Sequence, residues 1–252
     1  METVAVIPAR YDSSRLPGKP LAMIGNKPMI MHVYDRVKAS GLFSHVCVAT
    51  DHQDIAEAVD NGGGHYVMTG NDHKTGTERC TEAFRRVASE ADVIVNVQGD
   101  EPFIQCEPLR SLIDAFHDPE VEIATLATPV RNNEELHSSG TVKVVTDRAN
   151  KALYFSRSPI PFVRDASKEK WTNSFPYLRH IGIYAFQNKT LEQIATLHSS
   201  GLEEAESLEQ LRWMENGFPV HVIPAETDTF SVDTPEDLEK AQEYYRKLYN
   251  KS

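Results

Sequence analysis

Short apolar runs alternate with segments of helical periodicity over the first 120 residues, and this alternation limits the possible folds more than any other feature. Predicted strands lie at residues 4–8, 45–50, 66–68 and 92–97, and predicted helices at residues 28–39, 54–59, 77–89 and 108–116. Such an alternation is typical of a parallel sheet with helices on both faces. We therefore expect an α/β fold that is doubly wound, mostly parallel and Rossmann-like.

The pattern changes after residue 121. Strands are predicted at 121–130, 142–146, 151–156 and 181–186, with few helices between them. Helices follow at 190–197 and 205–215, then a strand at 220–223 and a helix at 234–249, whose start Asp233 or Thr234 can cap. The polar stretch 164–174 is expected to be a mobile loop. We expect one domain spanning residues 1–252, in which the second half adds a mixed-sheet extension.

The formal charge of −11 argues against a general nucleic-acid-binding protein, because such proteins need a basic surface to displace counterions. Any bound anion must therefore be held by a local group of cations. The cysteines, Cys47, Cys80 and Cys106, are far apart and form no CxxC pair, so neither a disulfide framework nor a zinc site is indicated. With no basic leader and no apolar stretch of membrane-spanning length, we expect a cytoplasmic protein without membrane partners.

Three cations lie close together in the segment 8–20, directly after the first predicted strand. Arg10 and Arg15 can grip phosphate oxygens with their forked guanidinium groups, and Lys19 supplies a point charge. Ligands of parallel sheets bind at the carboxyl ends of strands, where this segment lies, and Gly18 suits a tight turn there. The segment matches neither GxxxxGK[ST] nor GxGxxG. A triphosphate is the natural partner, and a solvated surface loop is the alternative.

Two carboxylates also follow predicted strands. Asp100 comes after the strand 92–97 and faces the same edge of the sheet as the cationic segment, where Mg²⁺ would prefer carboxylate oxygen. A plain turn is the more common role of a Gly-Asp pair, and capping of the last helix is the alternative role of Asp233. Thr75 and Glu78 have the spacing of a capping box at the start of the helix 77–89, which can explain both residues.

Several blocks together resemble the sugar-acid cytidylyltransferases, in the CMP-Kdo synthetase branch of the nucleotide-sugar pyrophosphorylase type. The first is IPARYDSSRLPGKPL at residues 7–21, followed by NVQGDEP at 96–102 and VDTPEDL at 232–238. The stretch KTGTER at 74–79 resembles the family's SGTER element, with Thr75 in place of the commoner serine. The downstream blocks are ALYFSR at 152–157, LRHIGIY at 178–184 and LEQLR at 208–212.

The resemblance implies roles for individual residues. Mg²⁺ would bind to Asp100 and Asp233, and the catalytic residues would be Arg10, Lys19, Asp100 and Asp233. Nucleotide-binding residues would be Ala9, Arg10, Arg15, Lys19, Thr75, Gly76, Thr77, Arg79, Gln98 and Gly99, with Arg79 at the acceptor oxygen of the pyrimidine. Sugar-binding residues would be Arg157, His180, Tyr184, Glu209 and Gln210. Residues 1–120 and 219–252 would bind mainly nucleotide, and residues 121–218 would bind mainly sugar and form a dimer.

The activity implied by the resemblance is transfer of CMP from CTP to the anomeric hydroxyl of 3-deoxy-D-manno-octulosonate (Kdo), with release of pyrophosphate. The product would serve lipopolysaccharide or capsule synthesis, and the enzyme would be a cytoplasmic homodimer. Two alternatives stay open at this point. The sugar can be 8-amino-Kdo or another sugar acid such as a neuraminate, or the chain can be a catalytically silent nucleotide-binding homologue, since a fold does not fix a function.

Overall fold

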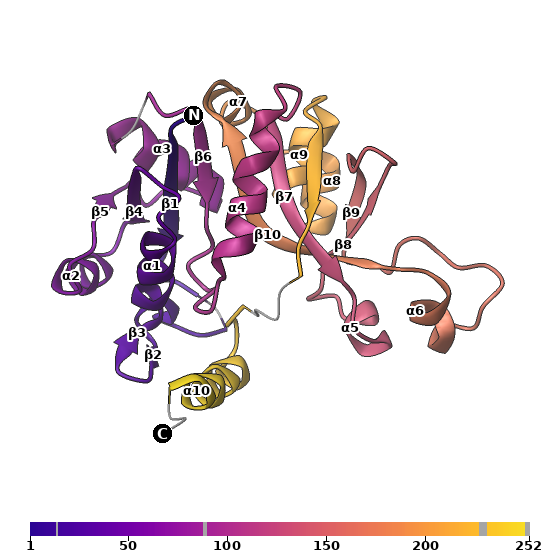
Figure 1. Cartoon of the computed structure of the whole chain (residues 1–252), viewed down its shortest axis with the longest axis horizontal. Helices are drawn as coiled ribbons and strands as arrows, with labels where there is room; N and C mark the ends of the chain where they lie inside the picture. Colours follow the sequence, from indigo (N-terminus) through magenta and orange to yellow (C-terminus); the bar gives the residue numbers. More distant parts are fainter. Residues whose placement is uncertain (14, 88–89, 227–230, 250–252) are drawn as a thin grey trace. The chain divides into compact units, whose positions relative to one another are not determined.

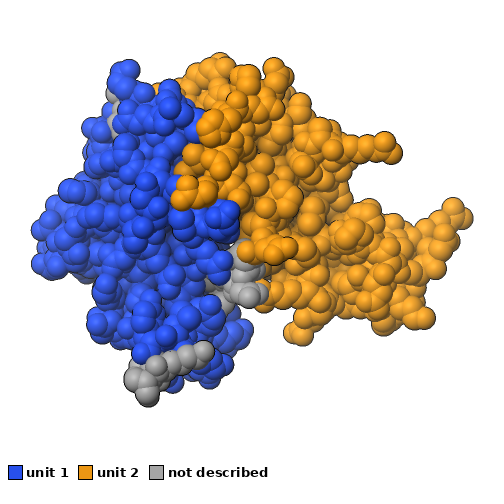
Figure 2. All heavy atoms as spheres, in the orientation of Figure 1, with its two compact units in different colours: residues 1–109, 228–252 blue, residues 110–227 orange. Residues whose placement is uncertain are grey.

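The computed structural model describes residues 1–13, 15–87, 90–226 and 231–249, and the chain forms two compact units. Unit 1 comprises residues 1–109 and 228–252, and unit 2 comprises residues 110–227 (Figure 2, blue and orange). The predicted helix end at Ser89 and Ser14 of the cationic segment lie outside the described residues. Because compact units can belong to one domain, the single domain and its division into nucleotide and sugar regions stay predictions.

The sheet of unit 1 is parallel, as the alternating sequence pattern predicts. Its strands lie in the order β6-β1-β4-β5 and comprise Val93–Asn96, Thr3–Ala9, His45–Thr50 and Tyr66–Met68, respectively. The central strands are rich in valine and isoleucine, and β6 is buried along its whole length. Burial on both faces removes the alternation of polar and apolar residues, which is why these strands read as continuous apolar runs.

The strand order of unit 1 defines where a ligand can bind. The chain passes from β1 through α1 (Met29–Ala39) to β4, then through α2 (Gln53–Asn61) to β5, and returns through α3 (Gly76–Val87) to β6 on the other side of β1 (Figure 1). Since such crossovers are right-handed, reversal of direction puts α3 on the opposite face from α1 and α2. The carboxyl ends of β1 and β6 flank this reversal, and open α/β sheets bind ligands at that point.

The last helix, α10 (Pro235–Tyr249), packs beside the hairpin of β2 (Met23–Ile24) and β3 (Lys27–Pro28) (Figure 1). The side chain of Gln242 accepts a hydrogen bond from the backbone of Gly25 and donates one to that of Met23. Thr234 caps the helix, because its Oγ1 accepts from the amide of Asp237 at 3.2 Å. Of the two predicted caps, Thr234 takes the role, and the carboxylate of Asp233 points elsewhere.

Unit 2 contains the mixed sheet that the sequence predicts. Strand β7 (Ile123–Pro129) lies between β11 (Val220–Pro224), which is parallel to it, and β10 (Leu178–Gln187), which is antiparallel. Beyond β10 lie β8 (Lys143–Thr146) and β9 (Ala152–Ser156), both in antiparallel pairs. The helical elements from Cys106 to Ile194 are α4 (Cys106–Asp114), η2 (Ala115–His117), α5 (Asn133–His137), η3 (Lys168–Lys170), α6 (Trp171–Ser174) and α7 (Asn188–Ile194).

Two predictions for unit 2 are wrong. The helix predicted at 205–215 is two helices, α8 (Gly201–Glu206) and α9 (Glu209–Glu215), because Ser207 adopts a left-handed conformation with φ of 52°. The loop predicted at 164–174 is helical from residue 168 onwards, because the buried Trp171 anchors it and its indole Nε1 donates to the carbonyl of Ala166. Among the described residues, no helix combines the length and the apolar composition needed to cross a membrane.

Candidate active site

The cationic segment turns back on itself directly after β1. Gly18 has φ of +65°, a conformation that residues with a Cβ rarely adopt, and its amide donates to the carbonyl of Tyr11. A short 3₁₀ helix, η1 (Lys19–Leu21), follows. The ring of Tyr11 stacks on that of His52, with centroids 4.0 Å apart, and so fixes the start of the segment.

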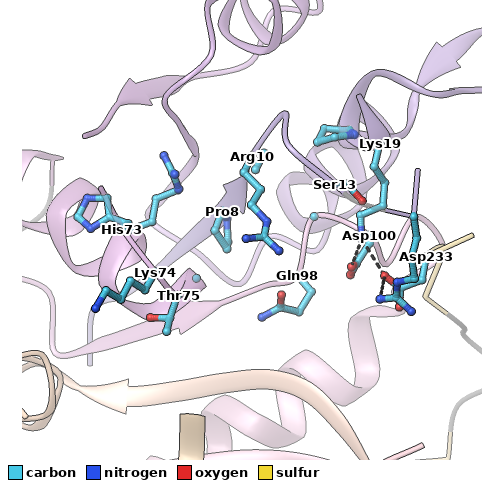
Figure 3. A pocket seen from close by; sticks show the side chains of 16 residues that line it. Pro8, Arg10, Ser13, Lys19, His73, Lys74, Thr75, Gln98, Asp100 and Asp233 are labelled. Carbon is cyan, nitrogen blue, oxygen red and sulfur yellow. Dashed lines mark hydrogen bonds and ion pairs between the residues drawn. The ribbon is translucent and has the colours of Figure 1, made fainter. Parts of the chain in front are cut away.

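Lys19 connects the two carboxylates that the sequence singles out. Its Nζ donates to Oδ2 of Asp100 at 2.7 Å and to Oδ1 of Asp233 at 3.0 Å (Figure 3). Arg15 approaches the same Oδ1 of Asp233, with Nη2 at 3.1 Å. Burial tends to lower the pKa of Lys19, but the two carboxylates outweigh it and raise the pKa above 10.5. Lys19 is therefore a permanent cation between two anions.

A pocket of about 290 Å³ opens beside this cluster. Of the predicted nucleotide-binding residues, all but Thr77 line it, and both predicted metal ligands do so. Thr77 is buried in α3, where its carbonyl accepts from Thr81. The lining also includes residues that were not predicted as site residues, although they lie in the segments that the sequence singles out: Pro8, Ser13, Pro20, His73 and Lys74.

The pocket is positively charged inside an acidic protein. Five Lys and Arg side chains line it but only two carboxylates do, whereas the whole chain has a formal charge of −11. Arg10 is exposed, and among the described residues it has no ion pair or hydrogen bond; its side chain reaches towards Gln98 in Figure 3. A Cβ on Gly99 would lie 2.9 Å from the carbonyl oxygen of Pro8, so glycine permits the ends of β1 and β6 to meet.

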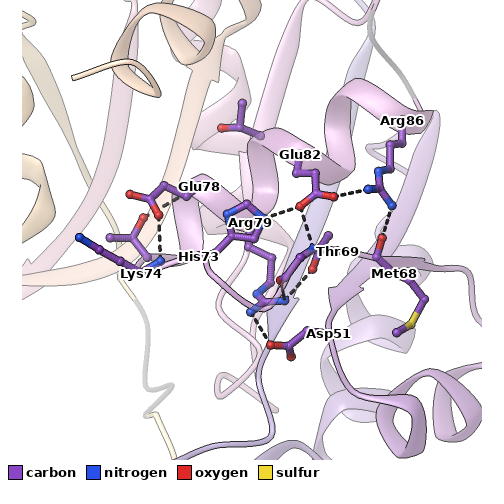
Figure 4. A network of polar contacts seen from close by, with 12 residues as sticks. Asp51, Met68, Thr69, His73, Lys74, Glu78, Arg79, Glu82 and Arg86 are labelled. Carbon is purple, nitrogen blue, oxygen red and sulfur yellow. Dashed lines mark hydrogen bonds and ion pairs between the residues drawn. The ribbon is translucent and has the colours of Figure 1, made fainter. Parts of the chain in front are cut away.

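The third predicted segment forms the opposite wall. Oγ1 of Thr75 accepts from the amide of Glu78 at 3.2 Å, and the carboxylate of Glu78 accepts from the amide of Lys74 at 2.8 Å (Figure 4). The predicted cap by Thr75 is thus confirmed, whereas Glu78 accepts from the amide of Lys74, one residue before the cap; Thr75 lines the pocket as well. One turn further along α3, Arg79 also lines the pocket. Its guanidinium donates to Oγ1 of Thr69 and to the carboxylate of Asp51.

A divalent cation fits the two carboxylates that line the pocket. Asp100 and Asp233 each have an oxygen within 3.0 Å of one nitrogen, so the fold already brings two carboxylates to a single cation. Within the described residues there is no group of three or more His, Cys, Asp and Glu side chains suited to a metal. Two carboxylates, completed by water and substrate phosphate, are the donor set that Mg²⁺ takes in nucleotide enzymes.

In unit 2, the predicted sugar residue Arg157 is bound to backbone. Its guanidinium donates to the carbonyls of Ser139, Glu206 and Ser207 at 3.0, 2.7 and 3.3 Å. The neighbouring Lys143 has no exposed surface, and its Nζ donates to the carbonyls of Ser138, Thr141 and Arg157. Burial lowers the pKa of Lys143 to about 8, with Glu206 raising it and Arg157 lowering it further.

His180 and Tyr184 lie on β10, on either side of an irregularity in its pairing with β7. Nε2 of His180 lies 2.9 Å from Oγ1 of Thr125, and Thr125 donates to the carbonyl of Ile183 at 2.8 Å. Because that hydroxyl proton is used, Nε2 carries the proton and donates to Thr125. Burial, assisted by the charge of Arg179, lowers the pKa of His180 to about 3, so the ring is neutral near pH 7. No sequence signal pointed to Thr125.

Glu209 and Gln210 begin α9. The carboxylate of Glu209 accepts from Nη2 of Arg212 at 2.9 Å. Gln210 is only 4% exposed, yet its Nε2 has no hydrogen-bond partner within the described residues. A buried amide donor without a partner is uncommon, and a ligand hydroxyl or an ordered water would satisfy it.

Comparison with known proteins gives one consistent result. A family model described as Cytidylyltransferase matches residues 4–223. The 3-deoxy-manno-octulosonate cytidylyltransferase of Parabacteroides distasonis is 47% identical over 245 residues, covering 96% of this chain and 97% of that protein. The protein of the same name from Bacteroides thetaiotaomicron is 47% identical over 249 residues, covering 98% and 99%. A solved CMP:2-keto-3-deoxy-manno-octonic acid synthetase complexed with CTP matches with a TM-score of 0.90 at 42% identity, covering 98% of this chain and 100% of that one.

Proposed function

The chain belongs to the cytidylyltransferase family, and on that premise we propose that it transfers CMP from CTP to the anomeric hydroxyl of Kdo, giving CMP-Kdo and pyrophosphate. The observation that carries the proposal is the cluster of Lys19, Asp100 and Asp233 at the edge of a cationic pocket. This cluster lies where an open α/β sheet reverses its strand order, the usual ligand site of such folds. A silent homologue would have no need to retain it.

The three cations of the first segment hold the triphosphate. Arg10 is exposed beside the pocket, so its forked donors can take phosphate oxygens without breaking a hydrogen bond or ion pair to any residue that the structure describes. Arg15 and Lys19 already lie beside Asp233, and their positive charges offset the negative charge that develops on the departing pyrophosphate. Thr75, Gly76 and Arg79 bind the nucleoside from the opposite wall, together with Gln98 and Gly99.

The reaction is an in-line displacement at the α-phosphorus of CTP. The C2 hydroxyl oxygen of Kdo forms the new bond to phosphorus and releases its proton to water. The bond from the α-phosphorus to the oxygen that bridges to the β-phosphate breaks, so pyrophosphate leaves with the electron pair. Positioning and neutralisation of charge supply most of the rate enhancement in such transfers. Asp100 and Asp233 would hold Mg²⁺, which when bound supplies Lewis-acid stabilisation of the phosphate charge.

Unit 2 supplies the groups for the sugar acid. Within the described part of the chain, Arg157 uses at most three of its five N–H groups on backbone carbonyls, which leaves at least two for the sugar carboxylate. His180 is neutral, so it acts as a hydrogen-bonding group and not as a counterion. The buried Nε2 of Gln210 is available to a hydroxyl oxygen, and Tyr184 and Glu209 complete the proposed set.

The cellular setting is part of the same proposal. We propose a cytoplasmic homodimer whose product enters lipopolysaccharide or capsule synthesis, on the strength of the family relation. Among its described residues, unit 2 exposes four large apolar side chains, Leu153, Phe162, Phe175 and Leu202, and Phe162 is 71% exposed. Light scattering coupled to size exclusion measures the assembly directly, and a monomeric mass at micromolar concentration would contradict the dimer.

The decisive test is pyrophosphate release from CTP and Mg²⁺ with Kdo, 8-amino-Kdo and N-acetylneuraminate compared side by side. We expect turnover with Kdo and a loss of about 10³-fold in Asp100→Ala, because the variant lacks one of the two carboxylates. The matched control is Asp35→Asn, which removes the exposed ion pair between Asp35 on α1 and Lys27.

Each outcome of this assay has a distinct meaning. Preference for 8-amino-Kdo or the neuraminate would keep the mechanism and change the sugar. Silence with all three acids, in a protein that still binds CTP, would support the non-catalytic alternative. Full activity of Asp100→Ala would remove Asp100 from the catalytic group.

A further inference from the structure

Arg79 combines burial with a place at the pocket, and neither the family motif nor the loop cations explain how it is held. It lies in the first turns of α3 and is only 5% exposed, yet it lines the pocket. A buried guanidinium is costly unless it is paired and hydrogen-bonded. The groups that satisfy Arg79 therefore decide which way its remaining donors point.

Two strand ends supply these groups (Figure 4). Asp51 directly follows β4, and its Oδ2 accepts from Nη2 of Arg79 at 3.1 Å. Thr69 directly follows β5, and its Oγ1 accepts from Nη1 at 2.6 Å, with the carbonyl of Gly70 3.3 Å from the same nitrogen. The amide of Thr69 donates to the carbonyl of Thr50 at 2.8 Å, so the two strand ends are joined. The guanidinium is thus fixed to the sheet itself.

This arrangement leaves directed donors and little net charge. Asp51 neutralises the cation, which distinguishes Arg79 from Arg10, whose charge has no partner among the described residues. Contacts with described residues use at most three of its five N–H groups, so at least two remain in this part of the chain. Arginine can only donate, so these groups select a ligand edge with adjacent acceptors. Cytosine presents O2 and N3 as acceptors, whereas uracil carries a proton on N3.

We propose that Asp51 and Thr69 are positioning residues for base selection, which hold Arg79 so that its free donors favour CTP over UTP. The proposal rests on the proposed function, because it concerns the nucleotide of the same reaction. Asp51 acts through Arg79, because Arg79 lines the pocket and Asp51 is not among the described residues that do so. Weakening this anchor lets the guanidinium turn, and the discrimination between the two pyrimidines decreases.

The pocket wall has a separate support, which makes the proposal testable. The carboxylate of Glu82 on α3 accepts from the amide of Gly70 at 2.9 Å and contacts the ring of His73 (Figure 4). Thr75 caps the same helix, and Glu78 accepts from the amide of Lys74. Loss of the Asp51 charge therefore leaves the loop 70–75 attached to α3, and the effect falls on Arg79.

The test compares Asp51→Asn with wild type in kcat and KM for CTP and for UTP. We expect kcat/KM for CTP to fall about 10-fold to 100-fold, mostly through KM, since base binding is shared by ground and transition states. For UTP the fall is smaller, so the CTP/UTP ratio decreases at least about 10-fold. Asp35→Asn, which changes an exposed carboxylate in the same way, keeps the wild-type ratio.

Further measurements separate positioning from stability. Thr69→Val removes the acceptor at nearly constant volume and lowers the CTP/UTP ratio. Thr69→Ser retains the hydroxyl and should keep the wild-type ratio. Calorimetric binding of CTP and UTP without any sugar acid gives the same ratio independently of turnover. A wild type that binds CTP selectively but turns over no acid would overturn the proposed function and leave this inference intact. An unchanged CTP/UTP ratio in folded Asp51→Asn and Thr69→Val would overturn the inference, because the pair would then only stabilise the fold.

Discussion

The two units hold a lysine of low exposure in opposite ways, with Lys19 partly buried and Lys143 fully buried. In unit 1, Lys19 lies between the carboxylates of Asp100 and Asp233 at the edge of the pocket. In unit 2, Lys143 is completely buried and donates to three backbone carbonyls. Side-chain carboxylates can exchange partners when a phosphate or a metal arrives, whereas backbone carbonyls are released only when their loop unfolds. The partner of a buried cation therefore indicates whether it serves chemistry or structure.

Replacement of Lys19 gives the largest expected effect. We expect Lys19→Met to lower kcat/KM for CTP by about 10²-fold to 10³-fold, because a fixed charge at the phosphates is lost. The thermal midpoint, measured with Mg²⁺ present, should stay within about 4 °C of wild type. Lys27→Met, which removes an exposed lysine paired with Asp35, is the control. Activity within about threefold of wild type would abolish the distinction between the two lysines.

The same substitution at Lys143 should affect stability. Lys143→Met removes the donor that three backbone carbonyls share, and we expect the free energy of unfolding to decrease by about 3 kcal/mol. That loss corresponds to a thermal midpoint lower by about 6–12 °C in a chain of this size. The KM for CTP of the folded variant should stay within about twofold of wild type. If urea unfolding showed unchanged stability, the hydrogen bonds from Lys143 to the three carbonyls would contribute nothing to the free energy of unfolding.

His180 tests by pH whether polar side chains of unit 2 contribute to stability. The folded protein holds the pKa of His180 at about 3, while the unfolded chain protonates near 6.5, so stability is lost as pH falls from 6.5 towards 3. We expect roughly 2 kcal/mol of this loss between pH 8 and pH 5. His180→Gln, whose amide can still donate to Thr125, should lack it. Parallel urea titrations of both proteins over this range would contradict the prediction if the two curves fell together.

The smallest effect separates two adjacent residues of unit 1. Thr234→Ala removes the cap of α10 and should cost about 1 kcal/mol of stability, with turnover within about twofold of wild type. Asp233→Asn should lower turnover and leave stability near that of wild type, since its carboxylate contacts Lys19 and Arg15 and does not cap the helix. Denaturation and turnover are measured on both variants. If either variant lost both stability and turnover, the two residues would not have separate roles.

The sequence pattern predicts most of the fold, because strand and helix periods are local properties. The parallel strands of unit 1 and the mixed strands of unit 2 follow from these periods. The errors arise where tertiary contacts decide the backbone. Nothing in the polar and apolar order of 205–215 announces the left-handed Ser207, and the helical turns at 168–174 depend on burial of one tryptophan.

The site divides in the same manner. Loops after strands share one edge of a parallel sheet, so the convergence of the cationic segment with Asp100 could be predicted. The partner of each side chain could not. Asp51 meets Arg79 across 28 positions of sequence, Thr125 meets His180 across 55, and Lys143 belongs to no motif. Such pairs are set by the register of neighbouring strands, which a single sequence does not specify.

The contact between Lys19 and Asp233 spans 214 positions, and this has a consequence for protein synthesis. A ribosome makes the cationic segment among the first residues and Asp233 only after more than two hundred others. The hairpin after that segment likewise waits for α10, whose Gln242 joins it. A chain that stops before Asp233 therefore carries the phosphate-binding cations with Asp100 but without Asp233, the second of the two carboxylates. The pocket is complete only after the last helix has been translated. A partly made chain therefore does not consume nucleotide.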